Sequence, residues 1–290
     1  MTNPLDGIHH TGLLTRDLDE LERRYTALGF TLSPRSRHLL AAAPGRPPVP
    51  SCTANHCALF GDSYIELLGI VDDTAPDPWH TRAIAARYEG FRLLNFDTAD
   101  ADAADRRLRA AGLATSGVLD LEREVGTEAG PRVLRARAVH VDPRSTPEVH
   151  LGVAQHLTRE YAHQPRYLGH ANGARGIAAV TIVVATAEMP AILDRYARIT
   201  DRHCYRDGPR TVLDIGSARL EFLDAAAAEQ VLPGEPVPAP SYPAAMTIRV
   251  DDPVRARRVV ENGGIATRSV PDGFYVSARD AGGSGLFFTR

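Results

Sequence analysis

Cysteine is scarce in this chain, with three residues among 290, at Cys52, Cys57 and Cys204. An odd number of cysteines without Cys-x-x-Cys spacing is typical of a reducing compartment rather than of a disulfide-stabilised secreted domain. Cys57 lies in an apolar segment, and we expect it to be a small core residue on a strand.

Long apolar runs and an excess of one charge are also missing. No run approaches the roughly 20 apolar residues that cross a bilayer, and residues 1–6 lack the basic and apolar stretches of a signal peptide. The formal net charge of −3 gives no long-range attraction to nucleic acid or to an anionic membrane. The chain has no Gly-x-Gly-x-x-Gly motif, no phosphate loop and no Ser-His-Asp order. We therefore expect a cytoplasmic protein that binds a small molecule.

The sequence does contain one pattern that occurs four times. In the first copy a short apolar strand at residues 8–14 precedes a helix that begins near Asp17 and ends at Gly29. One stripe of this helix is apolar and carries Leu18, Leu21, Tyr25 and Leu28. Further strands are predicted at residues 30–32, 56–60 and 64–68.

The other copies follow the same order of elements. Their first strands are predicted at residues 91–96, 177–184 and 245–250, their helices at 100–112, 189–199 and 253–262, and their last strands at 149–153, 219–223 and 285–288. We expect an N-terminal domain at residues 1–156, a connecting segment at 157–176 and a C-terminal domain at 177–290.

A strand, a helix and three strands, repeated in pairs, resembles the vicinal oxygen chelate superfamily. The segments 155–158 and 170–174 further resemble its four-module, glyoxalase-like branch, so the resemblance covers nearly the whole chain. It implies an α+β fold of four βαβββ modules paired into two half-barrel, glyoxalase-like domains. The superfamily includes isomerases, lyases, extradiol dioxygenases, thiol transferases and metal-free antibiotic-binding proteins, so the resemblance leaves the reaction open.

The resemblance also implies positions for metal ligands, on the first and last strands of each module. In the first copy these are His10 and Glu66, and in the second copy Val149-His150-Leu151 aligns with Ile65-Glu66-Leu67, which adds His150. Two imidazoles and one carboxylate suit a divalent ion such as Fe, Mn, Zn or Ni. The first-strand position of the second copy is Leu93, which cannot bind metal, with Asn95 on the same strand face.

Each candidate residue also has a purely structural interpretation. His9 and His10 are neighbours on a strand and should point to opposite faces, so at most one of them enters the cup. A carboxylate within an apolar strand, as at Glu66, is costly to bury without a partner and is therefore more informative. Asn55 and His56, like Asn95, are candidates for contact with the substrate, although a place at a solvated strand edge is equally consistent with the pattern.

These residues favour a metal-dependent lyase or isomerase that chelates two neighbouring oxygens of a small metabolite. Glu66 is the candidate that moves a proton. The alternatives are a metal-free binding or resistance protein of the antibiotic-binding type and an extradiol-type dioxygenase, the latter disfavoured because Leu93 replaces a ligand. The equivalent C-terminal positions are Ala179, Glu221, Ala245 and Phe287, so we expect a structural, lid or dimerisation role there, with a homodimer left open.

Overall fold

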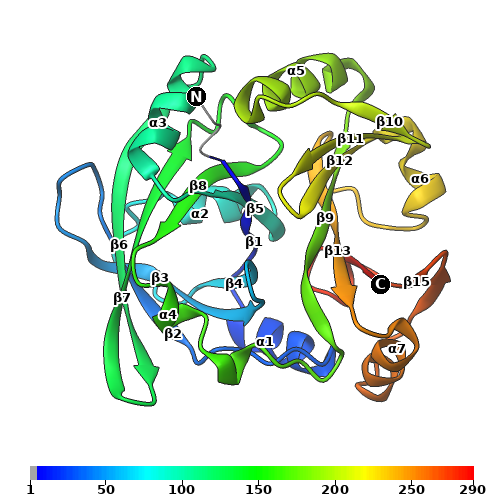
Figure 1. Cartoon of the computed structure of the whole chain (residues 1–290), viewed down its shortest axis with the longest axis horizontal. Helices are drawn as coiled ribbons and strands as arrows, with labels where there is room; N and C mark the ends of the chain where they lie inside the picture. Colours follow the sequence, from blue (N-terminus) through cyan, green and yellow to red (C-terminus); the bar gives the residue numbers. More distant parts are fainter. Residues whose placement is uncertain (1–4) are drawn as a thin grey trace.

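The computed structural model, which describes residues 5–290, contains two strand assemblies that stand side by side (Figure 1). Strands β1 to β8 close into a barrel, and strands β9 to β16 form a second eight-stranded sheet. Each assembly contains two copies of a strand, a helix and three strands. The predicted α+β fold of paired βαβββ modules is therefore confirmed.

The barrel is organised around β1 (Gly7–Thr15) and β5 (Gly90–Asp97), which pair antiparallel. Each has a parallel partner, β4 (Tyr64–Ile70) beside β1 and β8 (His150–His156) beside β5. The other barrel strands are β2 (Ser36–Leu40), β3 (Val49–Leu59), β6 (Thr115–Thr127) and β7 (Gly130–Val141). Because β2 pairs with β6, this unit is a closed barrel rather than the expected half-barrel.

The second sheet repeats this central arrangement without closing. Its middle strands β9 (Ala174–Val184) and β13 (Tyr242–Val250) pair antiparallel, with β12 (Ala218–Asp224) and β16 (Gly285–Thr289) parallel beside them. The outer strands are β10 (Tyr205–Asp207), β11 (Arg210–Ile215), β14 (Arg268–Val270) and β15 (Gly273–Val276). The two edge strands, β10 and β14, have three residues each and leave the sheet open.

Helices cover the outside of both assemblies. They are α1 (Leu18–Ala27), α2 (Thr81–Arg87), α3 (Ala101–Ala110), α4 (Arg159–Ala162), α5 (Met189–Thr200), α6 (Ala228–Val231) and α7 (Pro253–Asn262), with 3-10 turns at Pro165–Tyr167, Thr186–Glu188 and Ala225–Ala227. An aspartate caps the start of α1, α3 and α7: Asp17, Asp100 and Asp252. The predicted apolar stripe of α1 is buried. None of the helices within residues 5–290 has the length and apolar character needed to cross a membrane.

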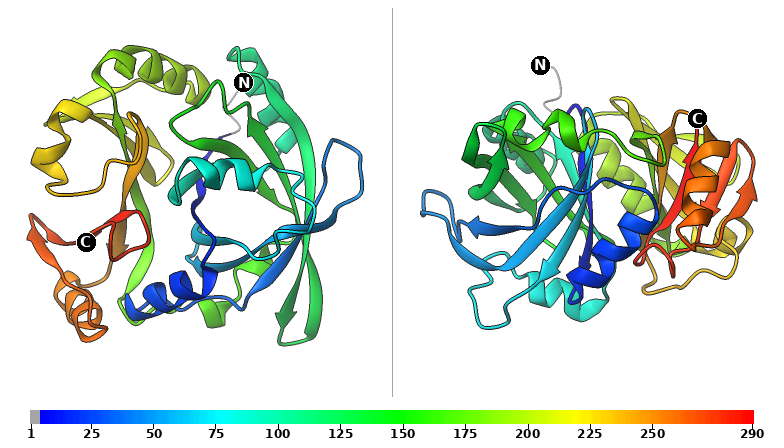
Figure 2. Two further views of the ribbon diagram at one scale, coloured as in Figure 1. Left: turned by 180° about the vertical axis from the view of Figure 1, so that it is seen from behind. Right: turned by 90° about the horizontal axis from the view of Figure 1, so that it is seen from below.

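One hydrophobic core runs through both assemblies. The ring of Phe30 lies 6.2 Å from that of Phe288, measured between ring centroids, and the Thr11 hydroxyl lies 2.9 Å from the Met246 sulfur. Figure 2 shows the two assemblies side by side in both views. The sheets divide the chain between β8 and β9, while independent domains at residues 1–156 and 177–290 stay a prediction.

One predicted strand is absent. Residues 30–32 form no strand, because this segment is held by the connection between the two assemblies. The Thr31 amide donates to Nδ1 of His170, and the Thr31 hydroxyl donates to the Gly169 carbonyl. The second strand of the first module begins only at Ser36, which places His38 on it.

Candidate functional site in the N-terminal barrel

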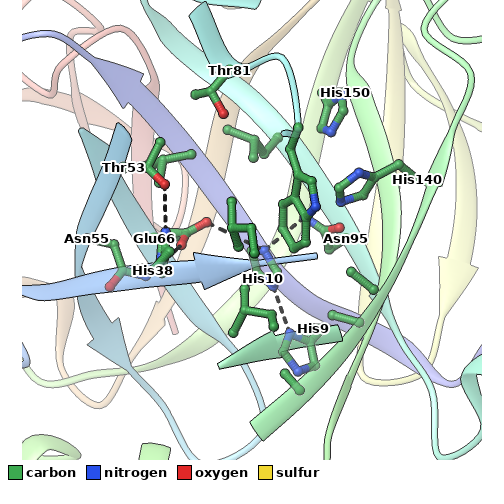
Figure 3. Close-up of a pocket in the computed structure, with 18 of the residues that line it drawn as sticks. His9, His10, His38, Thr53, Asn55, Glu66, Thr81, Asn95, His140 and His150 are labelled. Carbon is green, nitrogen blue, oxygen red and sulfur yellow. Dashed lines mark hydrogen bonds and ion pairs between the residues drawn. The ribbon is translucent and has the colours of Figure 1, made fainter. Parts of the chain in front are cut away.

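The barrel encloses a cavity of about 80 Å³, drawn in Figure 3. Six histidines of the described chain line it, together with polar residues from five strands. The histidines are His9, His10, His38, His140, His150 and His156, and the other polar residues that matter below are Asn55, Glu66, Asn95 and Arg123. This volume has room for a few water molecules or for the reactive end of a small polar ligand.

Glu66, on β4, is the buried carboxylate of this cavity. Its Oε1 accepts a hydrogen bond of 2.6 Å from the Asn55 amide and lies 3.8 Å from His38 Nε2. Its Oε2 lies 3.7 Å from His10 Nε2. Burial raises the pKa of the Glu66 carboxyl, while the Asn55 hydrogen bond and the charge of Arg123 act in the opposite direction. The Glu66 carboxyl is thus held at Oε1 by Asn55, while Oε2 faces His10 without a hydrogen bond to it.

His10, on β1, is hydrogen-bonded through both ring nitrogens. Its Nε2 lies 2.8 Å from the Asn95 amide nitrogen, and its Nδ1 lies 2.7 Å from His9 Nδ1. With the Asn95 amide in this orientation, Nε2 of His10 accepts, and Nδ1 carries the proton that it donates to His9. Burial and the nearby Arg123 lower the pKa of His10 to about 3, and the same causes lower that of His38 to about 3. Both imidazoles are therefore neutral at pH 7.

His9 and His10 both face the cavity, so the expectation that at most one of them would enter is wrong. The pairing of β1 with β5 shifts register between Ile8 and His10, which marks a β-bulge. A bulge breaks the alternation of side chains between the two faces of a strand. Two neighbouring residues can then point to the same side.

His150 is not the structural counterpart of Glu66, although matching the segment 149–151 with 65–67 in the sequence predicted that it would be. The helix caps Asp17 and Asp100 put the two modules in register, so that Gly12 and Asn95, each five residues earlier, correspond. Gly12 pairs with Glu66, and Asn95 pairs with Gly152. The counterpart of Glu66 is therefore Gly152, and His150 stands two residues away, about 7 Å along the strand.

The position of Gly152 is also closed to any side chain. A Cβ added there would lie 2.3 Å from the side-chain oxygen of Asn95. Within residues 5–290 no group of three or more His, Cys, Asp and Glu side chains is arranged to hold a metal ion. The predicted set of His10, Glu66 and His150 does not fit a common ion, because His150 stands apart and Asn95 already engages Nε2 of His10.

His56 does not belong to the cavity, which corrects its assignment as a substrate-pocket residue. On β3 the side chains alternate, so Asn55 points inward and His56 points outward to α1. The His56 Nδ1 lies 2.9 Å from the Ser33 carbonyl oxygen, and its Nε2 lies 3.4 Å from a carboxylate oxygen of Glu22. Asn55 and Asn95, in contrast, line the cavity, and their contact with a substrate stays a prediction.

Sequence reasoning missed His38, Arg123 and His140. His38 lies on β2, where no strand was predicted, and its Nδ1 is 2.9 Å from the Thr53 hydroxyl. Arg123, on β6, is 5% exposed and donates a hydrogen bond of 3.0 Å to the Asn55 side-chain oxygen. The signal in the sequence was the place of Arg123 within an alternating strand, on the same side as Leu119, Leu121 and Val125.

A second, outer chamber of about 540 Å³ adjoins the cavity. Trp79, Ile84, His140 and His150 line both spaces, and we call these four residues the neck. The Trp79 indole donates to the Ala41 carbonyl, and its ring lies 4.4 Å from that of His140. His140 and His150 lie next to each other in Figure 3, with their ring centroids 5.0 Å apart. Helix α2, which follows Trp79, lies over this opening of the barrel (Figure 2).

The equivalent carboxylate of the second sheet has a different environment. Glu221 is buried and forms ion pairs with Arg210 at 2.9 Å and Arg219 at 2.7 Å, and it accepts a hydrogen bond from Thr181. Its oxygens are thus engaged by the protein itself. This half supplies no open carboxylate comparable to Glu66.

Comparisons with known proteins agree with this architecture. The model of a family described as glyoxalase-like domain matches residues 8–200, whereas a search of curated proteins found no match. A hypothetical protein from Staphylococcus aureus has a similar structure, with a TM-score of 0.63, 12% identity and coverage of 97% of this chain and 98% of that one.

Two solved structures with enzyme names are also similar. A xylose isomerase-like TIM barrel/4-hydroxyphenylpyruvate dioxygenase fusion protein has a TM-score of 0.58 and 13% identity, over 93% of this chain and 41% of the fusion. A mutant of 4-hydroxymandelate synthase from Streptomyces coelicolor has a TM-score of 0.56 and 12% identity, over 92% and 78% of the two chains. At such identities the likeness shows the fold alone. Since the family model spans more than half of the chain, this protein belongs to the glyoxalase-like domain family, with the vicinal oxygen chelate fold.

Proposed function

We propose that the N-terminal barrel binds a small oxygenated metabolite and catalyses proton transfer on it, as an isomerase or a lyase. The observation that carries this proposal is the setting of Glu66, a buried carboxyl beside two neutral imidazoles in an enclosed cavity. A carboxyl with a raised pKa accepts and returns a proton near neutral pH more readily than one in water.

The surrounding side chains suit this chemistry. Asn55 holds Oε1 of Glu66, which leaves Oε2 for a proton on the carbon next to a substrate carbonyl. The developing enediolate oxygen then needs hydrogen-bond donors, and the Asn95 amide and the Arg123 guanidinium line the same cavity. In an isomerisation Glu66 returns the proton to the former carbonyl carbon, while the hydroxyl proton passes to the former carbonyl oxygen. In an elimination Glu66 keeps the proton, and the leaving group departs with its bonding electrons.

A divalent ion in the barrel remains a prediction from the family resemblance. The three-residue set inferred from the sequence does not fit one. Glu66 itself takes up the carbon-bound proton.

The proposal is tested by exchange of substrate hydrogen with D₂O. Hydroxyacetone and dihydroxyacetone are incubated with the protein, and loss of the carbon-bound hydrogens is followed by NMR. The wild type should accelerate exchange, and Glu66→Gln should slow it about 100-fold or more. Glu22→Gln, on α1 beside His56 at the outer wall of the barrel, removes a carboxylate outside the cavity and serves as the matched control. No acceleration by the wild type, or full activity of Glu66→Gln, contradicts the proposal.

A second candidate function is metal-free binding of a small molecule without reaction. The apolar part of the cavity favours it, because six leucines line the same space: Leu14, Leu40, Leu68, Leu93, Leu121 and Leu134. Saturable ligand binding with no exchange in any α-hydroxy ketone would select this function. Oxygen uptake with catechols tests the third alternative, an extradiol-type dioxygenase.

A further inference from the structure

The outer chamber carries positive charge that no carboxylate of the described chain balances. Arg87, Arg92 and Arg144 line it, and the carboxylate that lines it, Asp142, is paired with Arg144 at 2.6 Å. Within residues 5–290 neither Arg87 nor Arg92 has a carboxylate at ion-pair distance. The chamber therefore has an excess of two cations, and an anion is attracted to it.

Of Arg87 and Arg92, Arg92 gives the stronger argument for a bound anion, because its exposed fraction is only 3%. Its guanidinium carbon lies 3.8 Å from the centroid of the Tyr88 ring, and its Nε has no hydrogen-bond partner. A buried charge without a counter-ion is unfavourable, and arginine cannot relieve it by losing its proton. An anion bound from solution would satisfy both the charge and the free donor.

The location of Arg92 connects it with the inner cavity. It lies on β5 next to Leu93, which lines the inner cavity, and it lines the same chamber as the neck residue His150. Its charge acts on His150, whose pKa is lowered to about 4 by burial first and by Arg92 second. Because the outer chamber and the inner cavity share the neck residues, a molecule held at Arg92 can extend through the neck toward Glu66.

We propose that Arg92 binds a carboxylate group of the substrate in the outer chamber, so that the oxygenated carbon of the same molecule reaches Glu66. The inference deepens the proposed function and rests on it. A single planar guanidinium matches the two oxygens of a carboxylate, whereas a phosphate dianion calls for more cations than the one buried here. The substrate class is thus a small oxygenated carboxylic acid.

Benzoate and its uncharged isostere benzamide test this assignment, with binding measured by calorimetry or ligand-observed NMR. The wild type should bind benzoate about tenfold more tightly than benzamide. Arg92→Met should abolish this preference, and Arg92→Lys should restore part of it. The matched control is the double variant Asp142→Asn/Arg144→Met, which removes one anion and one cation from the same chamber and should keep the preference.

The outcomes separate this inference from the proposed function. Glu66→Gln should keep the preference for benzoate even if hydrogen exchange is lost, since Glu66 lies in the inner cavity. Equal binding of benzoate and benzamide by the wild type, or no binding of either, would overturn the inference, as would tighter binding of phenyl phosphate. If Arg92→Met does not fold, the wild type decides: added NaCl should weaken binding of benzoate and leave benzamide unchanged.

Discussion

The side chain of Asn95 occupies the space into which a side chain at Gly152 would project. A Cβ at Gly152 would lie 2.3 Å from Oδ1 of Asn95 and 3.2 Å from the Val139 carbonyl oxygen. The same Asn95 side chain contacts Nε2 of His10 at 2.8 Å. The glycine thus allows the amide to stand beside the imidazole.

Gly152→Ala should therefore destabilise the protein and disturb His10 at the same time. We expect a loss of about 1–3 kcal/mol in the free energy of unfolding, the usual cost of overpacking. Urea denaturation measures it. Combining Gly152→Ala with Asn95→Ala should cost less than the sum of the single changes, because the clash is then removed. Strict additivity would show that the two side chains do not compete for this space.

The buried histidines should make stability depend on pH. The pKa values of His10 and His38 are about 3 and that of His150 is about 4, against about 6.5 in an unfolded chain. Between pH 6.5 and the lowered pKa values the unfolded chain binds more protons than the folded one. The free energy of unfolding is therefore highest above pH 6.5 and falls as the pH drops toward 4. Each histidine contributes at most about 1.4 kcal/mol per pH unit.

Urea titrations at pH 7, 6 and 5 measure this slope. His38→Gln should reduce it, and His203→Gln, at an exposed position, should leave it as in the wild type. A slope that is the same in all three proteins would mean that His38 is not buried neutral.

Removal of His150 tests whether this residue belongs to a metal site. If the protein takes up Mn(II), Zn(II), Fe(II) or Ni(II), His150→Ala should bind the same ion with unchanged affinity, because the counterpart of Glu66 is Gly152. Calorimetry on protein purified without a histidine tag provides the measurement. Loss of uptake in His150→Ala would restore the original set of His10, Glu66 and His150.

An ion pair joins the two halves. Glu148, before β8, is completely buried, and both of its oxygens accept hydrogen bonds from Arg195 on α5, at 2.9 and 2.8 Å. Glu148→Gln leaves the arginine without a counter-charge and should cost about 3 kcal/mol. The exposed pair of Arg175 and Asp251 is the control, and Asp251→Asn should cost less than about 1 kcal/mol. Similar losses of unfolding free energy for Glu148→Gln and Asp251→Asn would contradict the claim that burial makes the Glu148–Arg195 pair more important for stability.

The fold could be predicted because the sequence patterns that determine its helices and strands are short and occur in each module. The stripe of α1 and the aspartates before α1, α3 and α7 are visible as patterns of a few residues. Glu66 could be found for the same reason, as a carboxylate within an apolar strand.

The composition of the site depends on features that short patterns do not contain. A bulge after Ile8 decides that His9 faces inward, and the register between β5 and β8 decides that Gly152, not His150, corresponds to Glu66. His38 was missed because the second strand was predicted at residues 30–32. Contacts of Thr31 with the connecting segment exclude a strand there, and the strand that carries His38 begins at Ser36. Register and tertiary contacts are set by the whole barrel, so one strand read alone does not reveal them.

The continuous core has a consequence for how this chain can diverge. Here the half without an open carboxylate still supplies Met246 and Phe288 to the packing of the half that has one. Substitutions there should therefore lower the abundance of folded protein rather than alter turnover in the barrel.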